Sequence, residues 1–198
     1  MRDVILASQS ASRRAMLDAA GLRYRAIPAH IDEAAITTAL LAEGQPPRAI
    51  ADALAEGKAL KLSRSHADAL VIGSDSLVSV AGRLFDKPVS RGAAAEHLRA
   101  FSGQTMQLTS AVVAAQNGRP VWRHVDQANL HVRALSESFI AQYLDSEWPA
   151  IAGCVGCFRI EGPGVQLFSR VDGDHFTILG MPLLPLLGWL RNCGMMPS

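Results

Sequence analysis

The sequence predicts an α/β protein with a mixed, twisted sheet and flanking helices. Helical and strand patterns alternate along its 198 residues without a strict β-α-β rhythm, and a hairpin signal separates two β-rich stretches. No G-x-G-x-x-G or P-loop sequence occurs, which disfavours a doubly wound dinucleotide fold. The length fits a single domain over residues 1–198, or one domain with two lobes around a cleft.

The first part of the chain is expected to alternate strands and helices. Residues 4–7 are apolar and strand-like, and residues 12–20 carry an apolar helical stripe that Gly21 terminates. The next elements are an extended stretch at 24–31, a helix opened by prolines at 47–62, a strand at 69–80 and a turn at Gly82. Strand 69–80 is too apolar for the edge of a sheet.

The rest of the chain continues this alternation. Ser90 and Ser136 are good N-caps, and Asn117-Gly118 is a strong hairpin signal. The expected elements are a helix at 90–101, strands at 105–115 and 120–132, a helix at 136–144, strands at 158–160 and 165–171, and a helix at 182–194.

The composition favours a cytoplasmic protein that binds neither nucleic acid nor membrane. The formal net charge is +1 and 19% of residues are charged, so no large basic face is expected. No apolar run reaches the roughly 20 residues needed to span a bilayer, and the apolar start is too short for a signal peptide. Three cysteines do not suggest a disulfide framework, and Cys154 and Cys157 are interpreted as small buried residues rather than a zinc site.

The segment Ser8-Gln9-Ser10-Ala11-Ser12-Arg13-Arg14 joins the first strand to the first helix. Backbone N–H groups at a helix start favour an anion. The serine hydroxyls and the forked guanidinium groups of Arg13 and Arg14 suit phosphate oxygens. The alternative is a capped, solvated first turn with surface arginines.

Asp75 interrupts the apolar strand 69–80, where an unpaired buried carboxylate is expensive. Strand alternation places it on the face of Gly73, and the missing side chain of Gly73 is interpreted as open space beside it. A carboxylate in that position needs a cation, a metal or a proton as its partner. This favours a functional site over a structural aspartate that bonds a turn.

Three further charged positions are ambiguous one by one. Lys58 lies on the apolar stripe of the helix at 47–62, either at a site or snorkelling past the edge of the core. Lys87 lies in a loop and Asp32-Glu33 follow an extended stretch, so alone each is no better than a surface charge. Taken with Asp75 they combine hard oxygen ligands for Mg²⁺ or Mn²⁺ with cations for phosphate.

These segments, in this order, resemble the Maf family of nucleotide pyrophosphatases. The resemblance spans nearly the whole chain, and the combination of segments is far more specific than any single segment. The matching segments are Leu6-Ala7-Ser8 through Arg13-Arg14, Ile31-Asp32-Glu33, Lys58-Ala59, Ile72-Gly73-Ser74-Asp75, Lys87-Pro88, Ser102-Gly103, Glu161-Gly162 and Gly173-Asp174 through Gly180-Met181-Pro182-Leu183. The resemblance implies a Maf/ITPase-like α/β fold with two lobes around a central cleft, often as a homodimer.

The resemblance also implies hydrolysis of a nucleoside triphosphate between its α and β phosphates, with Mg²⁺ or Mn²⁺ as cofactor. Carried over, Asp75 is the catalytic base and a metal ligand, and Glu33 is a second metal-associated acid. The phosphate-handling groups are Ser8, Arg13, Arg14, Lys58 and Lys87. A rival interpretation, a non-catalytic nucleotide-binding regulator of cell division and septum formation, needs the cations but not Asp75 as a base.

Glu161 bears on which nucleobase the substrate carries. Family members that resemble dTTP and UTP pyrophosphatases usually carry Gln here, and those acting on 7-methyl-GTP usually carry Glu. A carboxylate is a pure acceptor and can pair with N1–H and the exocyclic amine of guanine. Unless Glu161 simply pairs with Arg159 or Lys87, the sequence leans toward guanine-type nucleotides. Ser12 and Ser76 depart from the usual subgroup residues, so a dTTP or UTP preference stays open.

Overall fold

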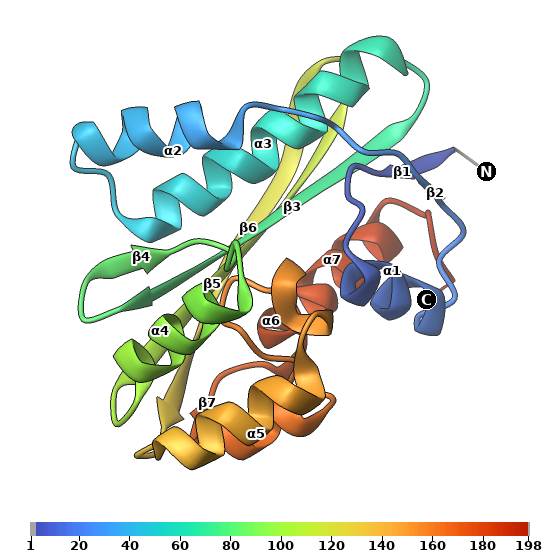
Figure 1. Cartoon of the computed structure of the whole chain (residues 1–198). Helices are drawn as coiled ribbons and strands as arrows, with labels where there is room; N and C mark the ends of the chain where they lie inside the picture. Colours follow the sequence, from blue (N-terminus) through green and yellow to red (C-terminus); the bar gives the residue numbers. More distant parts are fainter. Residues whose placement is uncertain (1–2, 198) are drawn as a thin grey trace. The chain divides into compact units, whose positions relative to one another are not determined.

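A computed structural model describes residues 3–197, and they group into two compact units (Figure 1). Unit 1 comprises the chain up to Ser76, Thr109–Asp126 and the chain from His175 on; unit 2 comprises Leu77–Leu108 and Gln127–Asp174. The single domain over residues 1–198 and the cleft stay predictions, and residues 1, 2 and 198 lie outside the described range.

The elements alternate as expected for an α/β protein. The strands are β1 (Val4–Leu6), β2 (Arg25–Ala26), β3 (Leu70–Val80), β4 (Arg83–Phe85), β5 (Thr105–Gln116), β6 (Arg119–Val132) and β7 (Phe168–Asp172). The helices are α1 (Ala11–Ala19), α2 (Glu33–Ala42), α3 (Pro47–Ser65), α4 (Arg91–Phe101), α5 (Glu137–Glu147), α6 (His175–Ile178) and α7 (Leu183–Asn192), with short 3-10 turns η1 (Ala150–Gly153) and η2 (Pro163–Leu167). Within residues 3–197, no helix combines the length and the apolar character that a membrane crossing requires.

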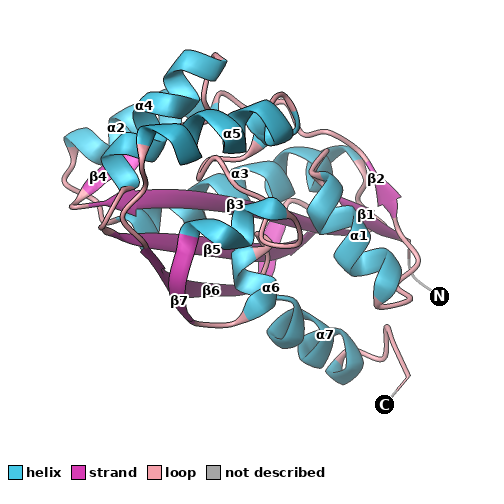
Figure 2. Cartoon of the chain, turned by 60° about the horizontal axis from the view of Figure 1, so that its bottom comes forward, coloured by secondary structure: helices cyan, strands magenta, loops and turns pink. Residues whose placement is uncertain are grey.

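The strands form one mixed sheet, which confirms the predicted fold class. Their order within residues 3–197 is β2-β1-β3-β5-β6-β7, with β4 paired to β3 (Figure 2). Strand β1 runs parallel to both β2 and β3, and Leu6 lies opposite Ile72. The pairs β3–β4 and β6–β7 are antiparallel. The long strands β3, β5 and β6 each contribute residues to both units.

The core of unit 1 covers both faces of its part of the sheet. On one face, Leu17 of α1 and Leu186 of α7 belong to an apolar cluster with Leu6 and Ile72. Side chains alternate along a strand, so the neighbours Ile5 and Val71 point to the opposite face. There α3 lies along the strands, and α2 packs against α3 (Figure 1). Two helical layers therefore enclose β1 and β3, as expected for parallel strands.

Unit 2 has its own aromatic packing. Phe85 of β4 meets Phe101 of α4 edge-to-face with ring centroids 4.8 Å apart, and Phe158 meets Phe168 in the same way at 4.9 Å. Helices α4 and α5 are capped by Ser90 and Ser136, as predicted from the sequence.

Most predicted elements are confirmed and a few are wrong. The Asn117-Gly118 hairpin is confirmed, with φ of 48° and 70° at the two residues. The strand expected at 158–160 is irregular, because the chain doubles back there. A Cβ on Gly164 would lie 2.5 Å from the Arg159 carbonyl oxygen. The strand expected at 165–171 begins only at Phe168, after the turn η2. Helices α2 and α6 and strand β4 were not predicted.

Candidate active site

Helix α3 lies against strand β3 at Gly73 with no side chain between the two backbones. A Cβ built on Gly73 would lie 2.2 Å from the Ala55 carbonyl oxygen and 2.7 Å from the Ala59 nitrogen. The interpretation of Gly73 as open space beside Asp75 is therefore wrong: its missing side chain makes room for a helix. This close approach brings Lys58 of α3 to Asp75 of β3.

Asp75, Lys58 and Glu33 form a group of charged side chains that we name the Asp75 cluster. Lys58 Nζ lies 2.5 Å from Asp75 Oδ1 and 2.8 Å from Glu33 Oε1. The side chains of Asp75 and Lys58 are 9% and 11% exposed, whereas that of Glu33 is 50% exposed. Lys58 therefore does not snorkel to water. The cluster has a buried end at Asp75 and an open end at Glu33.

The open end is supplied by the start of helix α2. Asp32 is its N-cap, and Asp32 Oδ1 accepts a hydrogen bond of 2.9 Å from the Ala35 backbone nitrogen. Glu33 is the first helical residue, where a negative charge is favourable. The two neighbouring carboxylates thus have different partners: Asp32 caps the helix and Glu33 pairs with Lys58.

Burial and neighbouring charges act on Asp75 in opposite directions. Burial raises the pKa of the Asp75 carboxyl, and the positive charges of Lys58 and Arg13 oppose that rise. Burial lowers the pKa of the Arg13 guanidinium, which Asp75 and Glu33 oppose. An arginine nevertheless keeps its charge in proteins. Two cations therefore balance two carboxylates at this place.

Arg13 is held by three hydrogen bonds from its guanidinium group. It donates to the Gly180 carbonyl at 2.8 Å, to Ser8 Oγ at 3.3 Å and to Ser76 Oγ at 3.0 Å. Ser10 caps helix α1 by accepting from the Arg13 backbone nitrogen. The structure thus combines the two sequence interpretations of this segment: the turn is capped, and Arg13 is a buried cation with Ser8 at its side.

The Gly180 carbonyl is a centre that the sequence interpretation missed. It accepts from Arg13 Nε and also from Ser74 Oγ and Ser76 Oγ, at 3.1 and 3.0 Å. Ser76 Oγ lies 2.8 Å from Ser110 Oγ, which donates to the Thr177 carbonyl. Gly180 has φ of 108°, which favours glycine. The run of serines around Asp75 was the signal available, but nothing in the sequence indicates their partner.

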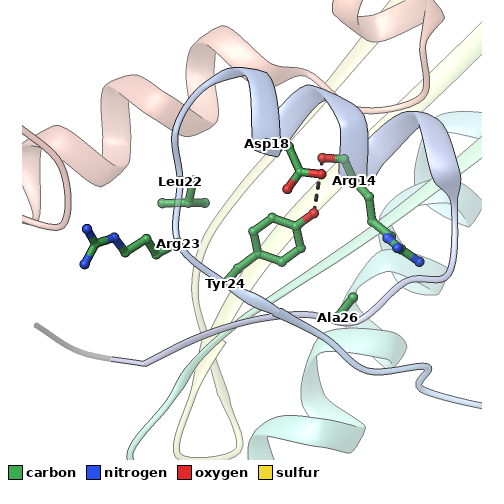
Figure 3. A pocket seen from close by; sticks show the side chains of 6 residues that line it. All are labelled: Arg14, Asp18, Leu22, Arg23, Tyr24 and Ala26. Carbon is green, nitrogen blue, oxygen red and sulfur yellow. Dashed lines mark hydrogen bonds between the residues drawn. The ribbon is translucent and has the colours of Figure 1, made fainter.

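Arg14 is not brought to the Asp75 cluster. Successive residues on a helix point about 100° apart, so Arg14 faces away from the side that Arg13 takes. It is exposed and lines a surface depression of about 510 Å³ with Asp18, Arg23 and Tyr24. There the Tyr24 hydroxyl donates to the Arg14 carbonyl oxygen at 3.1 Å (Figure 3). The substrate-binding role of Arg14 stays a prediction that this placement does not support.

Lys87 and Glu161 belong to unit 2, and both side chains are exposed there. Burial raises the pKa of the Cys154 thiol; Glu161 adds to that rise and Lys87 opposes it. Both charges therefore act on the same thiol. Cys157 is buried, and burial raises the pKa of its thiol to about 12, which makes it unreactive at neutral pH.

Glu161 forms no ion pair, among the described residues, with the partners that the sequence suggested, although its charge contributes to the raised pKa of Arg159. Arg159 instead holds Glu147 with two hydrogen bonds of 3.0 and 2.9 Å. Glu147 is buried at the end of α5, so this pair has a structural role. Within residues 3–197, no ion pair joins Glu161 to Arg159 or Lys87. The Glu161 carboxylate is therefore available as an acceptor.

The donors of the Asp75 cluster suit a metal ion that enters the site together with a phosphate compound. Among residues 3–197, no three His, Cys, Asp or Glu side chains gather as a ready-made metal site. Asp75 and Glu33 supply two hard carboxylates that share one cation, Lys58 Nζ. Mg²⁺ is commonly held by one or two carboxylates together with phosphate oxygens and water. The donor set matches that pattern.

Comparison with known proteins points to one family. The sequence model of the family "Maf-like protein" matches residues 3–193. A nucleoside triphosphate pyrophosphatase of Sphingopyxis alaskensis is 51% identical over 98% of this chain and 99% of its own length. A protein of the same name from Granulibacter bethesdensis is 47% identical, with 96% of each chain covered. A 7-methyl-GTP pyrophosphatase of Rhizobium meliloti is 49% identical, also with 96% of each covered.

One solved structure is a more distant match. The HAM1 protein from Coxiella burnetii shares 14% sequence identity, covers 67% of this chain and 73% of its own, and superimposes with a TM-score of 0.37.

Proposed function

Because the chain belongs to the Maf family, we propose that it is a nucleoside triphosphate pyrophosphatase that cleaves between the α and β phosphates. The observation that carries the proposal is the buried Asp75 cluster beside Arg13, in which a carboxylate of raised pKa is surrounded by cations. Relatives that cover nearly the whole chain carry the name of this activity.

Asp75 is the proposed base. Lys58 bonds only its Oδ1 atom, and within residues 3–197 no donor bonds Oδ2. Oδ2 accepts a proton from water while the water oxygen forms a bond to the α-phosphorus. The bond from that phosphorus to the bridging oxygen breaks, and pyrophosphate leaves with the electron pair. A raised pKa suits a general base, because it brings the base closer to working pH.

The cations of unit 1 are proposed to bind the phosphate chain. The guanidinium group of Arg13 spends three donors on Ser8, Ser76 and Gly180, which fix its plane and leave two N–H groups for phosphate oxygens. Such pre-positioned donors stabilise charge that develops on the leaving group. Lys58 supplies a second cation within reach of Asp75.

Mg²⁺ or Mn²⁺ is the proposed cofactor, held by Asp75 and Glu33. Its chemistry when bound is to neutralise the phosphate oxygens and to lower the pKa of a coordinated water. The residues of the chain orient the same site without it, since Lys58 already holds the two carboxylates together.

The function is tested by pyrophosphate release from canonical and modified triphosphates with Mg²⁺ or Mn²⁺. We expect one molecule each of nucleoside monophosphate and pyrophosphate per turnover, and loss of turnover in excess chelator. Product analysis by anion-exchange chromatography distinguishes this from release of orthophosphate. Nucleotide binding without any product would instead support the non-catalytic regulator of cell division.

A guanine-type base, such as 7-methylguanine, is the proposed preference. Glu161 is an exposed carboxylate that, among the described residues, forms no ion pair with Arg159 or Lys87. It can accept from both N1–H and the exocyclic amine of guanine, whereas a uracil or thymine edge offers it one donor and repels it with two carbonyls. The relative from Rhizobium meliloti is named for 7-methyl-GTP.

Replacing Glu161 with glutamine is expected to weaken this preference. The amide donates as well as accepts, so it loses one guanine bond and gains one to a pyrimidine carbonyl. We expect the ratio of kcat/KM for 7-methyl-GTP over UTP to fall about tenfold or more, which corresponds to one hydrogen bond of roughly 1.4 kcal/mol. Glu137→Gln, an exposed glutamate on α5, is the control. An unchanged ratio would remove Glu161 from base recognition.

A further inference from the structure

The segment that leads into helix α2 turns sharply at His30. This residue has φ of 48°, in the left-handed region that residues with a side chain rarely adopt. Three residues later the chain reaches Glu33, the open end of the Asp75 cluster. The direction in which Glu33 leaves the turn therefore depends on how the backbone at His30 is held.

Lys61 of α3 holds that backbone. Its Nζ donates to the His30 carbonyl oxygen at 2.5 Å. Lys58 and Lys61 are three residues apart on α3 and so lie on one side of the helix. The first holds the carboxylate of Glu33 and the second holds the turn before it.

Gly57 completes this contact between α3 and the turn. A Cβ on Gly57 would lie 3.3 Å from Ile31 Cδ1 and 3.7 Å from Ile36 Cδ1. The two isoleucines therefore pack over the helix backbone at a place without a side chain. Residues 30–36 therefore meet residues 57–61 of α3 through an ion pair, a hydrogen bond and the contacts of two isoleucines.

We propose that Lys61 is a positioning residue: by holding the His30 carbonyl it fixes the turn that presents Glu33 to the metal accompanying the triphosphate. This inference rests on the proposed function. Lys61 itself is exposed and does not contact the Asp75 cluster. Its effect is transmitted through the three backbone units between His30 and Glu33.

The predicted consequence is a change in metal dependence rather than in folding. An exposed lysine bonded to one carbonyl contributes little to global stability. Losing a group that orients a metal-binding carboxylate, however, typically lowers metal affinity by about 10- to 100-fold. The effect should therefore appear in the affinity for the divalent cation while the nucleotide KM at saturating metal stays near wild type.

The test compares Lys61→Met, which keeps the stem and removes the donor, with Lys61→Arg, which restores a donor. Arg64→Met, one turn further along α3 and also exposed, is the matched control. At saturating GTP, we expect Lys61→Met to raise the Mg²⁺ concentration for half-maximal pyrophosphate release about tenfold, the usual effect of losing a group that orients a metal ligand. Lys61→Arg should stay within about twofold of wild type, and Arg64→Met should not differ from it.

A second measurement separates this inference from the proposed function. Binding of Mn²⁺ in the presence of the non-hydrolysable α,β-methylene GTP is followed by electron paramagnetic resonance, which needs no turnover. Weaker Mn²⁺ binding in Lys61→Met alone supports the positioning role even if no triphosphate is cleaved. Equal Mn²⁺ binding in all variants, no rescue by arginine, or no Mn²⁺ binding by the unmodified protein would overturn it.

Discussion

Replacing Asp75 with asparagine is expected to lower kcat for pyrophosphate release by at least about 10²-fold, the usual contribution of a general base. Asparagine has nearly the same shape and can still pack between Lys58 and the strand, but it cannot take a proton from water. KM should change much less than kcat, because Arg13 and Lys58 keep their charges. Steady-state kinetics with saturating Mg²⁺ measure both.

The pH dependence of wild type checks the assignment independently. The ionised carboxylate is the active form of a base, so kcat/KM, which reports the free enzyme, rises as the pH rises through the pKa of Asp75 and is lost below it. Burial raises that pKa, which moves this limb above the ordinary carboxyl range of about 4. Asp75→Asn should lack the limb. Asp68→Asn, an exposed carboxylate just before β3, should retain wild-type kinetics. Normal turnover in Asp75→Asn would refute the mechanism.

Replacing Gly73 with alanine is expected to be the most damaging small substitution in unit 1. The new Cβ would lie 2.2 Å from the Ala55 carbonyl, a backbone atom that no change of rotamer can move. Helix α3 must then separate from β3, at a cost of about 3 kcal/mol or more. For a chain of this length that corresponds to a fall in Tm of about 6–12 °C. Thermal unfolding followed by circular dichroism measures it.

Gly188→Ala is the matched control for this prediction. Gly188 lies inside α7, and a Cβ there meets nothing within 4 Å. Alanine is a better helix former than glycine. The free energy of unfolding of the variant should therefore stay unchanged or rise by about 0.5–1 kcal/mol, and its Tm should not fall. Equal effects of the two substitutions would mean that the contact between α3 and β3 is looser than the structure indicates.

The fold class and the local elements were largely predictable from sequence, because they rest on local signals. Ser90 and Ser136 cap helices, and Asn117-Gly118 forms a hairpin, through interactions that span only a few residues. Helix α2 was missed because its apolar residues are spread around the helix rather than gathered in one stripe, and the structure buries none of them. The sequence holds its N-cap, Asp32, but a cap without periodicity does not predict a helix.

The two buried charges of the Asp75 cluster could be singled out from the sequence, but the contacts around them could not. Asp75 and Lys58 each looked unusual because a charge interrupted an apolar pattern, and the structure joins them. Gly73 was misread because a glycine beside a carboxylate fits a ligand or a packed helix equally well. The Gly180 carbonyl could not have been found, because any residue can offer a carbonyl and its partner Arg13 is 167 positions away.

That last separation has a consequence for synthesis. The carbonyl partner of Arg13 leaves the ribosome 167 residues after Arg13 itself. At translation speeds of 5–20 residues per second, this means a delay of roughly 10–30 s. During that time the buried guanidinium lacks its best acceptor, and leucines 183, 186, 187 and 190 of α7 are missing from the core cluster. The nascent chain therefore cannot form the hydrogen bond from Arg13 to the Gly180 carbonyl, or bury these leucines in the core of unit 1, until α7 has been made.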